Sequence, residues 1–295
     1  MKKTTHFKQM IAAPEILVLP GAYDSLSAKI IQQAGFQAVT MGGYPASATL
    51  LGKPDVNLLS LTEMVDHARR IAEAVDIPLF VDGDTGHGNV TNVIRTIREF
   101  EKAGVAGLFI EDQVSPKRCG HMEGKQVIPA DEMVAKVKAA VDARLDQDFV
   151  IMARTDARAI NGLDDAIERG NRYREAGADI IFVEAPVEEK ELRRITADIG
   201  APTMANMVEG GKTPAYTAKE FEGMGFAVAA FPLSTIYASA WAVSGLMAEL
   251  FMTGTTRGYA DRLLDFNDFN RLVGLEDVRE TERRYYQSIV DQPTH

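Results

Sequence analysis

The segment PLFVDGDTGHG, residues 78–88, is a short apolar run that ends abruptly in two carboxylates and three glycines. A second apolar run, GLFIED at 107–112, ends in the same way with Glu111 and Asp112. Runs that are apolar throughout, rather than alternately, are typical of parallel strands covered on both faces. The polar residues after each run therefore mark the carboxyl ends of two buried strands.

Short apolar runs of this kind recur along the whole chain. The predicted strands cover residues 16–20, 37–41, 78–81, 107–111, 149–155, 179–184, 202–206 and 227–231. Predicted helices lie between them at 25–34, 61–75, 90–103, 131–144, 163–176, 188–199, 217–223 and 235–252. Ala-Gly pairs at 34–35, 103–104 and 176–177 place glycine just after a helix, where a left-handed residue ends it. Eight such units favour a (β/α)8 TIM barrel over an open doubly wound sheet.

The chain exceeds what eight strand–helix units need. The predicted organisation is a single barrel domain over residues 1–295, with a C-terminal helical extension over about 255–295. Two further helices are expected there, with apolar surface from Phe266, Phe269, Tyr285 and Tyr286. This surface can pack on its own barrel or on a neighbouring chain, and exchange of a terminal helix is one route to a homo-oligomer.

Composition limits the kinds of partner. The net charge of −10 and a pI near 5.1 argue against a broad nucleic-acid-binding face, but not against a small anionic substrate. A single cysteine excludes an internal disulfide framework and suits a reducing compartment. The N-terminus has no signal-type apolar core, and we expect no apolar run long enough to span a bilayer. The expectation is a cytoplasmic protein with no membrane or nucleic-acid partner.

Polar residues follow nearly every predicted strand. In a (β/α)8 barrel, active sites form where the strands end, at the C-terminal face. That rule brings to one mouth the residues Gly42, Gly43, Tyr44, Asp82, Asp84, Glu111, Asp112, Arg154, Thr155, Asp156, Glu184 and Asn206, with Asp55 in the segment after strand two. The convergence predicts a functional site at this mouth.

Four of these carboxylates point to a metal. Asp82, Asp84, Glu111 and Asp55 offer the oxygen ligands that Mg²⁺ prefers, and crowded carboxylates repel one another unless they share a cation or a proton. The alternative is that one or two of them cap the helices that follow.

The segment KRCGHMEGK, residues 117–125, holds the only cysteine. Cationic neighbours and His121 would favour the thiolate of Cys119 and suit acid–base work near neutral pH. The alternative is a small buried hydrophobic residue. Arg154 likewise has two interpretations, which can coexist: a bidentate clamp for a substrate carboxylate, or an ion pair with Glu184 or Asp156.

These motifs resemble those of the isocitrate lyase / phosphoenolpyruvate mutase superfamily. VDGDTGHG at 81–88 is similar to its metal-strand motif, IEDQ at 110–113 to its next strand, and KRCGH at 117–121 to its active-loop signature. The resemblance runs from about residue 22 to about 234. It implies a (β/α)8 barrel, a Mg²⁺ cofactor with Mn²⁺ as a substitute, and a 2-oxo-acid or enolate product. It also implies a helix-swapped oligomer, commonly a tetramer.

The resemblance also assigns roles. It implies that Asp82 binds the metal, with Asp55, Asp84 and Glu111 assisting directly or through water. It implies that Cys119 is the proton donor of a gating loop. His121, Arg154 and Glu184 would take part in catalysis. Substrate contacts would come from Gly42, Gly43, Tyr44, Asp82, Gly120, Arg154, Glu184 and Asn206.

Within the superfamily, the Cys-Gly-His segment groups this chain with the carbon–carbon lyases. Tyr237 stands where methylisocitrate lyases place an arginine for a third carboxylate, so a dicarboxylate such as 2,3-dimethylmalate is expected to fit better than 2-methylisocitrate. Segments 13–18, 121–125 and 206–214 also look close to carboxyphosphonoenolpyruvate mutase, which forms a phosphorus–carbon bond. A third alternative is a catalytically silent, ligand-binding barrel.

Overall fold

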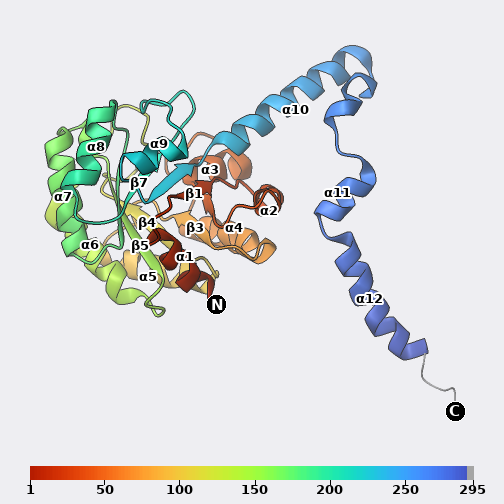
Figure 1. Ribbon diagram of the computed structural model, residues 1–295, viewed down its shortest axis with the longest axis horizontal. Coiled ribbons are helices and arrows are strands. Elements are labelled where there is room, and N and C mark those ends of the chain that lie inside the picture. The colour runs from red at the N-terminus through yellow and green to blue at the C-terminus, as the bar shows by residue number, and fades with distance from the viewer. Residues whose placement is uncertain (291–295) are drawn as a thin grey trace. The chain divides into compact units, whose positions relative to one another are not determined.

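The computed structural model describes the backbone of residues 1–290 and the side chains of residues 1–286, and its central element is a sheet of eight parallel strands (Figure 1). The strands are β1 (Leu17–Pro20), β2 (Val39–Met41), β3 (Leu79–Asp82), β4 (Gly107–Glu111), β5 (Val150–Thr155), β6 (Ile180–Val183), β7 (Thr203–Asn206) and β8 (Val228–Phe231). They pair in the order β1-β8-β7-β6-β5-β4-β3-β2. Each predicted strand is found within two residues of its expected bounds.

The sheet closes on itself between its first and second strands. No ladder joins β1 to β2, but a parallel bridge pairs Gly21 with Thr40, and the N–H of Ala22 donates to the Thr40 carbonyl at 2.7 Å. The predicted (β/α)8 barrel is therefore confirmed, with closure at one bridge.

Helices surround the strands. In chain order they are α1 (Lys3–Ile11), α2 (Ser25–Gln33), α3 (Gly43–Leu51), α4 (Leu61–Ala74), α5 (Val90–Lys102), α6 (Ala130–Ala143), α7 (Leu163–Glu175), α8 (Glu189–Asp198) and α9 (Ala218–Gly223), with a 3₁₀ turn η1 (Ala157–Ala159) before α7. The glycines predicted to end helices at 35, 104 and 177 all have positive φ. Helix α3 was not predicted, because Gly42, Gly43 and Pro45 resemble a turn. Proline is tolerated there because the first turn of a helix lacks intrahelical N–H bonds.

The barrel interior is apolar, and α1 covers its N-terminal end. Phe7 of α1 stacks on Phe80 of β3 with ring centroids 5.4 Å apart, and Phe80 in turn contacts Phe109 of β4. Phe109 meets Phe182 of β6 edge to face at 6.3 Å. These rings fill the barrel axis, so polar groups are confined to the opposite, C-terminal end of the strands.

The chain divides into two compact units, Met1–Tyr237 and Ala238–His295. The first holds the whole barrel. The second holds most of α10 (Ser234–Thr253), a 3₁₀ turn η2 (Arg257–Arg262), α11 (Phe266–Leu272) and α12 (Leu275–Val290). The two extra helices expected after Gly254 are present. The last residues of the predicted 255–295 extension, 291–295, lie outside the described residues, and the single-domain assignment stays a prediction.

Helix α10 corrects one expectation. Its 20 residues, with mean hydropathy 1.2, are long and apolar enough to cross a membrane by length and composition alone. The statement that no apolar run approaches that length is therefore wrong, because small residues between Trp241, Leu246 and Phe251 keep the mean hydropathy high. One such helix is weak grounds for a membrane span, since helices of water-soluble proteins meet the same criterion.

Candidate active site

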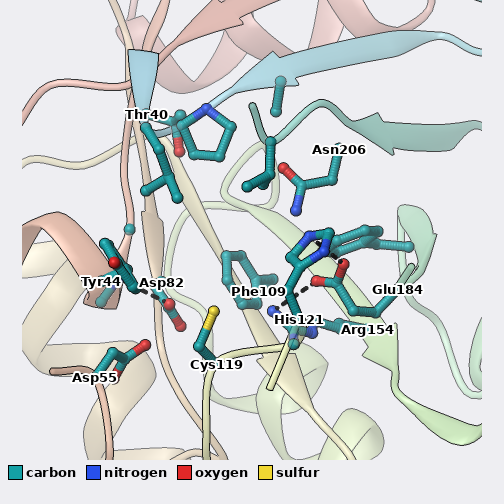
Figure 2. Close-up of a pocket in the computed structure, with 18 of the residues that line it drawn as sticks. Thr40, Tyr44, Asp55, Asp82, Phe109, Cys119, His121, Arg154, Glu184 and Asn206 are labelled. Carbon is teal, nitrogen blue, oxygen red and sulfur yellow. Dashed lines mark hydrogen bonds and ion pairs between the residues drawn. The ribbon is translucent and has the colours of Figure 1, made fainter. Parts of the chain in front are cut away.

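A cavity opens at the carboxyl ends of the strands, where the site was predicted (Figure 2). Its floor is the apolar end of the barrel core, made by Phe80, Phe109, Phe182, Met204 and Ala230. Its polar lining is Asp55, Asp82, Lys117, Arg118, Cys119, His121, Arg154, Glu184 and Asn206, together with Gly42, Gly43, Tyr44 and Gly120. Two predicted metal ligands, Asp84 and Glu111, do not line the cavity.

The four predicted metal-binding carboxylates do gather, but they gather around a lysine. Lys117 Nζ lies 2.7 Å from Asp55 Oδ2 and 2.7 Å from Asp84 Oδ1, and its side chain is only 3% exposed. Burial opposes the charge of this ammonium, yet the surrounding carboxylates raise the pKa of Lys117 well above its ordinary value. Lys117 therefore acts as an internal counter-ion for this cluster.

Asp82 is held differently from its neighbours. Its Oδ2 accepts the backbone N–H of Gly43 at 2.9 Å, and its Oδ1 accepts the backbone N–H of Asp84 at 2.8 Å. The N-terminus of α3 and the turn after β3 thus fix this carboxylate at the cavity wall. Backbone N–H groups therefore hold both oxygens of the Asp82 carboxylate in one orientation.

The donor set fits a divalent cation that keeps part of its water shell. No three Asp, Glu, His or Cys side chains converge on one point among the residues that the structure describes. However, the buried Oε1 of Glu111 has no hydrogen-bond partner, and burial raises the pKa of Glu111 well above its ordinary value. Mg²⁺ commonly takes one or two carboxylates and retains several waters. Asp82 suits direct binding, and Asp55, Asp84 and Glu111 suit contact through water.

Arg154 occupies the other side of the cavity, among three carboxylates. It forms a bidentate pair with Asp156, with Nε to Oδ2 at 2.9 Å and Nη2 to Oδ1 at 3.0 Å. Its Nη1 lies 3.1 Å from Glu184 Oε2, and its Nε lies 3.3 Å from Glu111 Oε2. The guanidinium also lies over the rings of Phe109 and Phe182. The ion pairs predicted with Glu184 and Asp156 both form.

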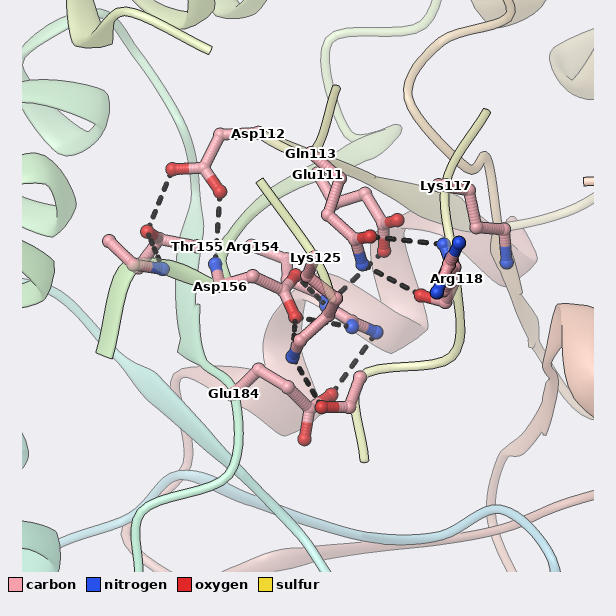
Figure 3. A network of polar contacts seen from close by, with 12 residues as sticks. Glu111, Asp112, Gln113, Lys117, Arg118, Lys125, Arg154, Thr155, Asp156 and Glu184 are labelled. Atoms are coloured by element: carbon pink, nitrogen blue, oxygen red, sulfur yellow. Dashed lines mark hydrogen bonds and ion pairs between the residues drawn. The ribbon is translucent and has the colours of Figure 1, made fainter. Parts of the chain in front are cut away.

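A buried network behind β4 and β5 anchors Asp156 (Figure 3). Asp112 Oδ1 accepts the backbone N–H of Asp156 at 2.9 Å. Asp112 Oδ2 accepts from Thr155 Oγ1 at 2.7 Å and from Tyr173 O–H at 2.8 Å. Arg169 Nη1 donates to the same oxygen at 3.2 Å. Asp112 therefore orients β5 at the level of Arg154, and it does not line the cavity.

Residues 114–126, here called the Cys119 loop, fold over the cavity from the end of β4. An antiparallel bridge pairs Gln113 with Val127 at its base. The Gln113 side chain bonds both backbone groups of Arg118, accepting from its N–H at 3.0 Å and donating to its carbonyl at 2.8 Å. The backbone N–H of Cys119 donates to the Asp55 carbonyl at 3.3 Å. These contacts set the thiol over the cavity (Figure 2).

The thiol of Cys119 is not poised as a thiolate. Burial raises its pKa above the ordinary value, and the charges of Glu184 and Asp55 act in the same direction. The expectation that cationic neighbours favour the thiolate is wrong, because Lys117 turns to Asp55 and Asp84 while Arg118 donates to the Glu123 carbonyl. At neutral pH the thiol of Cys119 is therefore protonated.

His121 joins the Cys119 loop to the loop after β7. Its Nδ1 accepts the backbone N–H of Lys212 at 3.1 Å, so the proton of the neutral ring is on Nε2. Nε2 lies 3.3 Å from Glu184 Oε1, without the geometry of a hydrogen bond. Burial lowers the pKa of His121, which keeps the ring neutral.

The remaining predicted residues also reach the cavity. Gly42 caps α3, so the first N–H groups of that helix face the site, and Asn206 ends β7 at the rim. Tyr44 packs edge to face on Tyr237 with ring centroids 6.3 Å apart. Burial raises the pKa of Tyr237 to about 12.

Two buried lysines of the Cys119 loop were not predicted as part of the site. Lys117 was treated only as a neighbour of Cys119, and Lys125 likewise. Both side chains are almost fully buried, at 3% and 2% exposed, and each pairs with a carboxylate of the barrel. The sequence does place a lysine on each side of Cys-Gly-His, and the neighbouring strands end in acidic residues. That pattern could have predicted that the two lysines pair with those acids.

The sequence of the barrel unit matches a known family. The phosphoenolpyruvate phosphomutase family model covers residues 7–251. The chain belongs to the phosphoenolpyruvate phosphomutase family. This confirms the resemblance drawn from residues 81–88, 110–113 and 117–121, and enzymes of this superfamily use a divalent metal.

Several members of the phosphoenolpyruvate phosphomutase family are very similar to this chain. The 2,3-dimethylmalate lyase of Eubacterium barkeri is 49% identical over 285 residues, which span 97% of this chain and 99% of that enzyme. The chloroplastic carboxyvinyl-carboxyphosphonate phosphorylmutase of Arabidopsis thaliana is 47% identical over 285 residues, 95% of this chain and 84% of the plant protein. A crystal structure of a 2,3-dimethylmalate lyase superposes with a TM-score of 0.92 at 32% identity, covering 100% of this chain and 99% of that one.

Proposed function

We propose that the protein is a metal-dependent carbon–carbon lyase. Its substrate is a substituted malate or isocitrate-type 2-hydroxy acid, of the 2,3-dimethylmalate or 2-methylisocitrate class. The products are pyruvate or a related 2-oxo acid and a short carboxylic acid. The observation that carries the proposal is the protonated thiol of Cys119, held by a closed loop over a cavity with Asp82 on one side and Arg154 on the other. The similarity to 2,3-dimethylmalate lyase supports it.

The two sides of the cavity bind different parts of the substrate. When bound, the divalent cation supplies positive charge for the oxygens of the pyruvate-like unit. The N–H group of Tyr44, in the first turn of α3, holds that unit from the same side, while the N–H of Gly43 stays on Asp82. Arg154 and Asn206 orient the second carboxylate, and Glu184 keeps the guanidinium in place through its 3.1 Å contact.

Cleavage leaves negative charge on the departing fragment. Asp55, a cavity-lining carboxylate whose pKa is raised by burial, takes the proton of the 2-hydroxyl. The hydroxyl becomes a carbonyl as the bond from C2 to C3 breaks, and C3 retains the electron pair. Cys119 then gives its proton to C3. A thiol with a raised pKa keeps that proton until the carbanion forms, and the closed loop excludes water that would compete as a donor.

The preferred substrate class follows from an uncharged part of the cavity wall. Tyr44, Val208 and Leu233 line the cavity, Tyr237 packs on Tyr44, and none of these side chains carries a positive charge. A third carboxylate would lose its water there without gaining a cation. Alkyl groups suit this wall better, so a dicarboxylate such as 2,3-dimethylmalate is favoured over a tricarboxylate.

Three finer assignments belong to the same proposal. The cation is Mg²⁺, with Mn²⁺ as a substitute, because the donors are carboxylate oxygens. The protein works in the cytoplasm, which suits a lone free thiol. It forms a homotetramer of helix-exchanged dimers, supported by exposed apolar side chains on α10 and α11 such as Trp241, Phe251 and Phe266.

The test is direct turnover. Purified protein with Mg²⁺ is incubated with 2,3-dimethylmalate and with 2-methylisocitrate, and pyruvate is measured by a coupled dehydrogenase. We expect pyruvate from the first at the higher kcat/KM. Absence of pyruvate from both contradicts the lyase assignment. Turnover that survives Cys119→Ser unchanged contradicts the role of the thiol, and no turnover or chemistry with any substrate would favour the silent barrel.

The second candidate is carboxyphosphonoenolpyruvate mutase. The 47% identity to the plant phosphorylmutase favours it, since the same cavity would accept a phosphonate in place of a carboxylate. Phosphorus NMR on the carboxyphosphonate substrate distinguishes the two, because only the mutase produces a new phosphorus–carbon resonance.

A further inference from the structure

Lys125 lies just beyond the Cys-Gly-His segment and has no contact with the cavity. It does not line the cavity, and its side chain is 2% exposed. An unpaired ammonium at that depth would be strongly unfavourable, so its partners define its role. Those partners lie on two different elements.

The first partner is the carboxylate that holds Arg154. Lys125 Nζ lies 2.6 Å from Asp156 Oδ1, the same oxygen that accepts from Arg154 Nη2 at 3.0 Å. Asp156 is completely buried and anchored through Asp112. One immobile oxygen therefore receives both the substrate-side guanidinium and an ammonium from the loop (Figure 3).

The second partner is the carbonyl of Gly120, to which Lys125 Nζ also donates. Gly120 is the residue between Cys119 and His121. It packs directly on the other side of the cavity, since a Cβ there would overlap Arg154 Nη2 and the side chain of Glu184. Lys125 thus holds the backbone of the thiol-bearing segment at a fixed distance from the guanidinium.

We propose that Lys125 is a positioning residue that fixes the Cys119 segment relative to Arg154. Its ammonium donates to the Gly120 carbonyl and to Asp156 Oδ1, the oxygen that Arg154 also binds. It touches no reacting atom. Its ammonium makes the proton donor and the carboxylate clamp part of one rigid unit when the loop is closed. Without it, the loop retains its Gln113 and Lys117 anchors but its tip is free to lift.

Only the measurement of kcat and KM in this test rests on the proposed lyase function. Cys119 is the only cysteine of the chain, so alkylation by iodoacetamide reports loop closure without any turnover. Lys125→Met removes the charge and keeps most of the volume, while Lys125→Arg keeps a charge that can reach Asp156. Lys138→Met makes the same change at an exposed lysine on α6 and is the matched control.

For Lys125→Met we expect kcat to fall about a hundredfold with KM nearly unchanged, because a misplaced donor slows the chemical step more than binding. We expect Cys119 to be alkylated about tenfold faster, because local opening becomes easier. Lys125→Arg should recover most of both effects, and Lys138→Met should behave as the original protein. If Lys125→Met does not fold, Lys125→Gln replaces it.

Three results would overturn the assignment. One is an unchanged alkylation rate in Lys125→Met, which would show that the loop closes without this ammonium. A loss confined to KM would make Lys125 a substrate ligand. If Lys125→Arg recovers neither kcat nor the slow alkylation rate, the charge at position 125 is not what matters, and the role of Lys125 is packing. If the original protein has no lyase turnover, the function proposal fails, whereas the alkylation rates still decide the role of Lys125.

Discussion

Lys117 and Lys125 lie on either side of Cys119-Gly120-His121 and have similarly buried side chains, but they differ in the carboxylates that they neutralise. Lys117 enters the cluster of Asp55 and Asp84 beside the cavity wall, where a divalent cation is also expected. Lys125 meets Asp156, which lies behind Arg154 and does not line the cavity. Two buried lysines of one loop therefore differ in their proposed roles. Lys117 offsets carboxylate charge where the metal is proposed to bind, and Lys125 is proposed to fix the position of the loop.

The largest expected effect is the loss of stability when the positive charge of Arg154, beside Asp156 and Lys125, is removed. Arg154→Met leaves Glu111, Asp156 and Glu184 buried, with Lys125 beside Asp156 and Lys117 acting on Glu111 as the remaining cations. We expect the free energy of unfolding to fall by about 3–5 kcal/mol, the usual result of breaking a buried ion pair from one side. Urea unfolding followed by circular dichroism measures it.

The control for that experiment is Arg193→Met. Arg193 forms an exposed i,i+4 pair with Glu189, and such pairs contribute little to stability. Equal losses in the two variants would show that the Arg154 cluster is solvated, and would remove the basis for treating this side of the cavity as rigid.

A second prediction separates the two lysines by metal binding. Lys117→Met removes a positive charge beside Asp55 and Asp84, so we expect Mg²⁺ to bind about tenfold more tightly in the absence of substrate. Lys125→Met should leave Mg²⁺ affinity unchanged because Asp156 is outside the cavity. Isothermal titration calorimetry of both variants tests this. Weaker Mg²⁺ binding in Lys117→Met would contradict it.

The smallest expected effect concerns the pKa of the thiol between the two sides. Burial raises the pKa of Cys119, so alkylation of the folded protein should reach its midpoint above the pH found for the urea-unfolded chain, near 8.5. The raised pKa also means that the protonated thiol stabilises the folded protein. This contribution is fully present below the pKa of Cys119 in the unfolded chain and is lost as pH rises through its pKa in the folded protein. Rates measured from pH 7 to 10.5 give both midpoints.

Two variants test which side of the cavity has the larger effect on the pKa of Cys119. Glu184 raises the pKa of Cys119 more than Asp55 does, so Glu184→Gln should lower the midpoint further than Asp55→Asn. The reverse order would mean that the thiol responds mainly to the Lys117 side. A midpoint equal to that of the unfolded chain would contradict burial as the cause.

The strand ends were predictable because they follow from local pattern. An apolar run that stops at Asp82, Glu111, Arg154, Glu184 or Asn206 marks the same face of a parallel barrel, whatever the loops do. The structure confirms the strands and brings Asp82, Arg154, Glu184 and Asn206 to one cavity. It shows Glu111 behind the wall, because the β4 carboxylate pairs with Arg154 on β5.

The loop contacts were not predictable from sequence neighbours. Lys117 and Arg118 precede Cys119, yet neither side chain turns toward the thiol in a way that favours its ionisation. The partners of Lys117 and Lys125 are far along the chain, at Asp55 and Asp156. Such pairings depend on how an irregular loop folds back over the barrel, which no periodicity encodes. Helix α3 was missed for a related reason, since its first turn contains Gly43 and Pro45.

The close packing of Gly120 on Arg154 and Glu184 has a consequence for the timing of catalysis. The loop supplies one wall of the cavity. Under the proposed lyase function, substrate entry and product release are therefore expected to require this wall to lift, with one opening and one closing of the Cys119 loop in each turnover. In such an arrangement the maximal rate is bounded by a backbone motion, however fast the bond itself breaks.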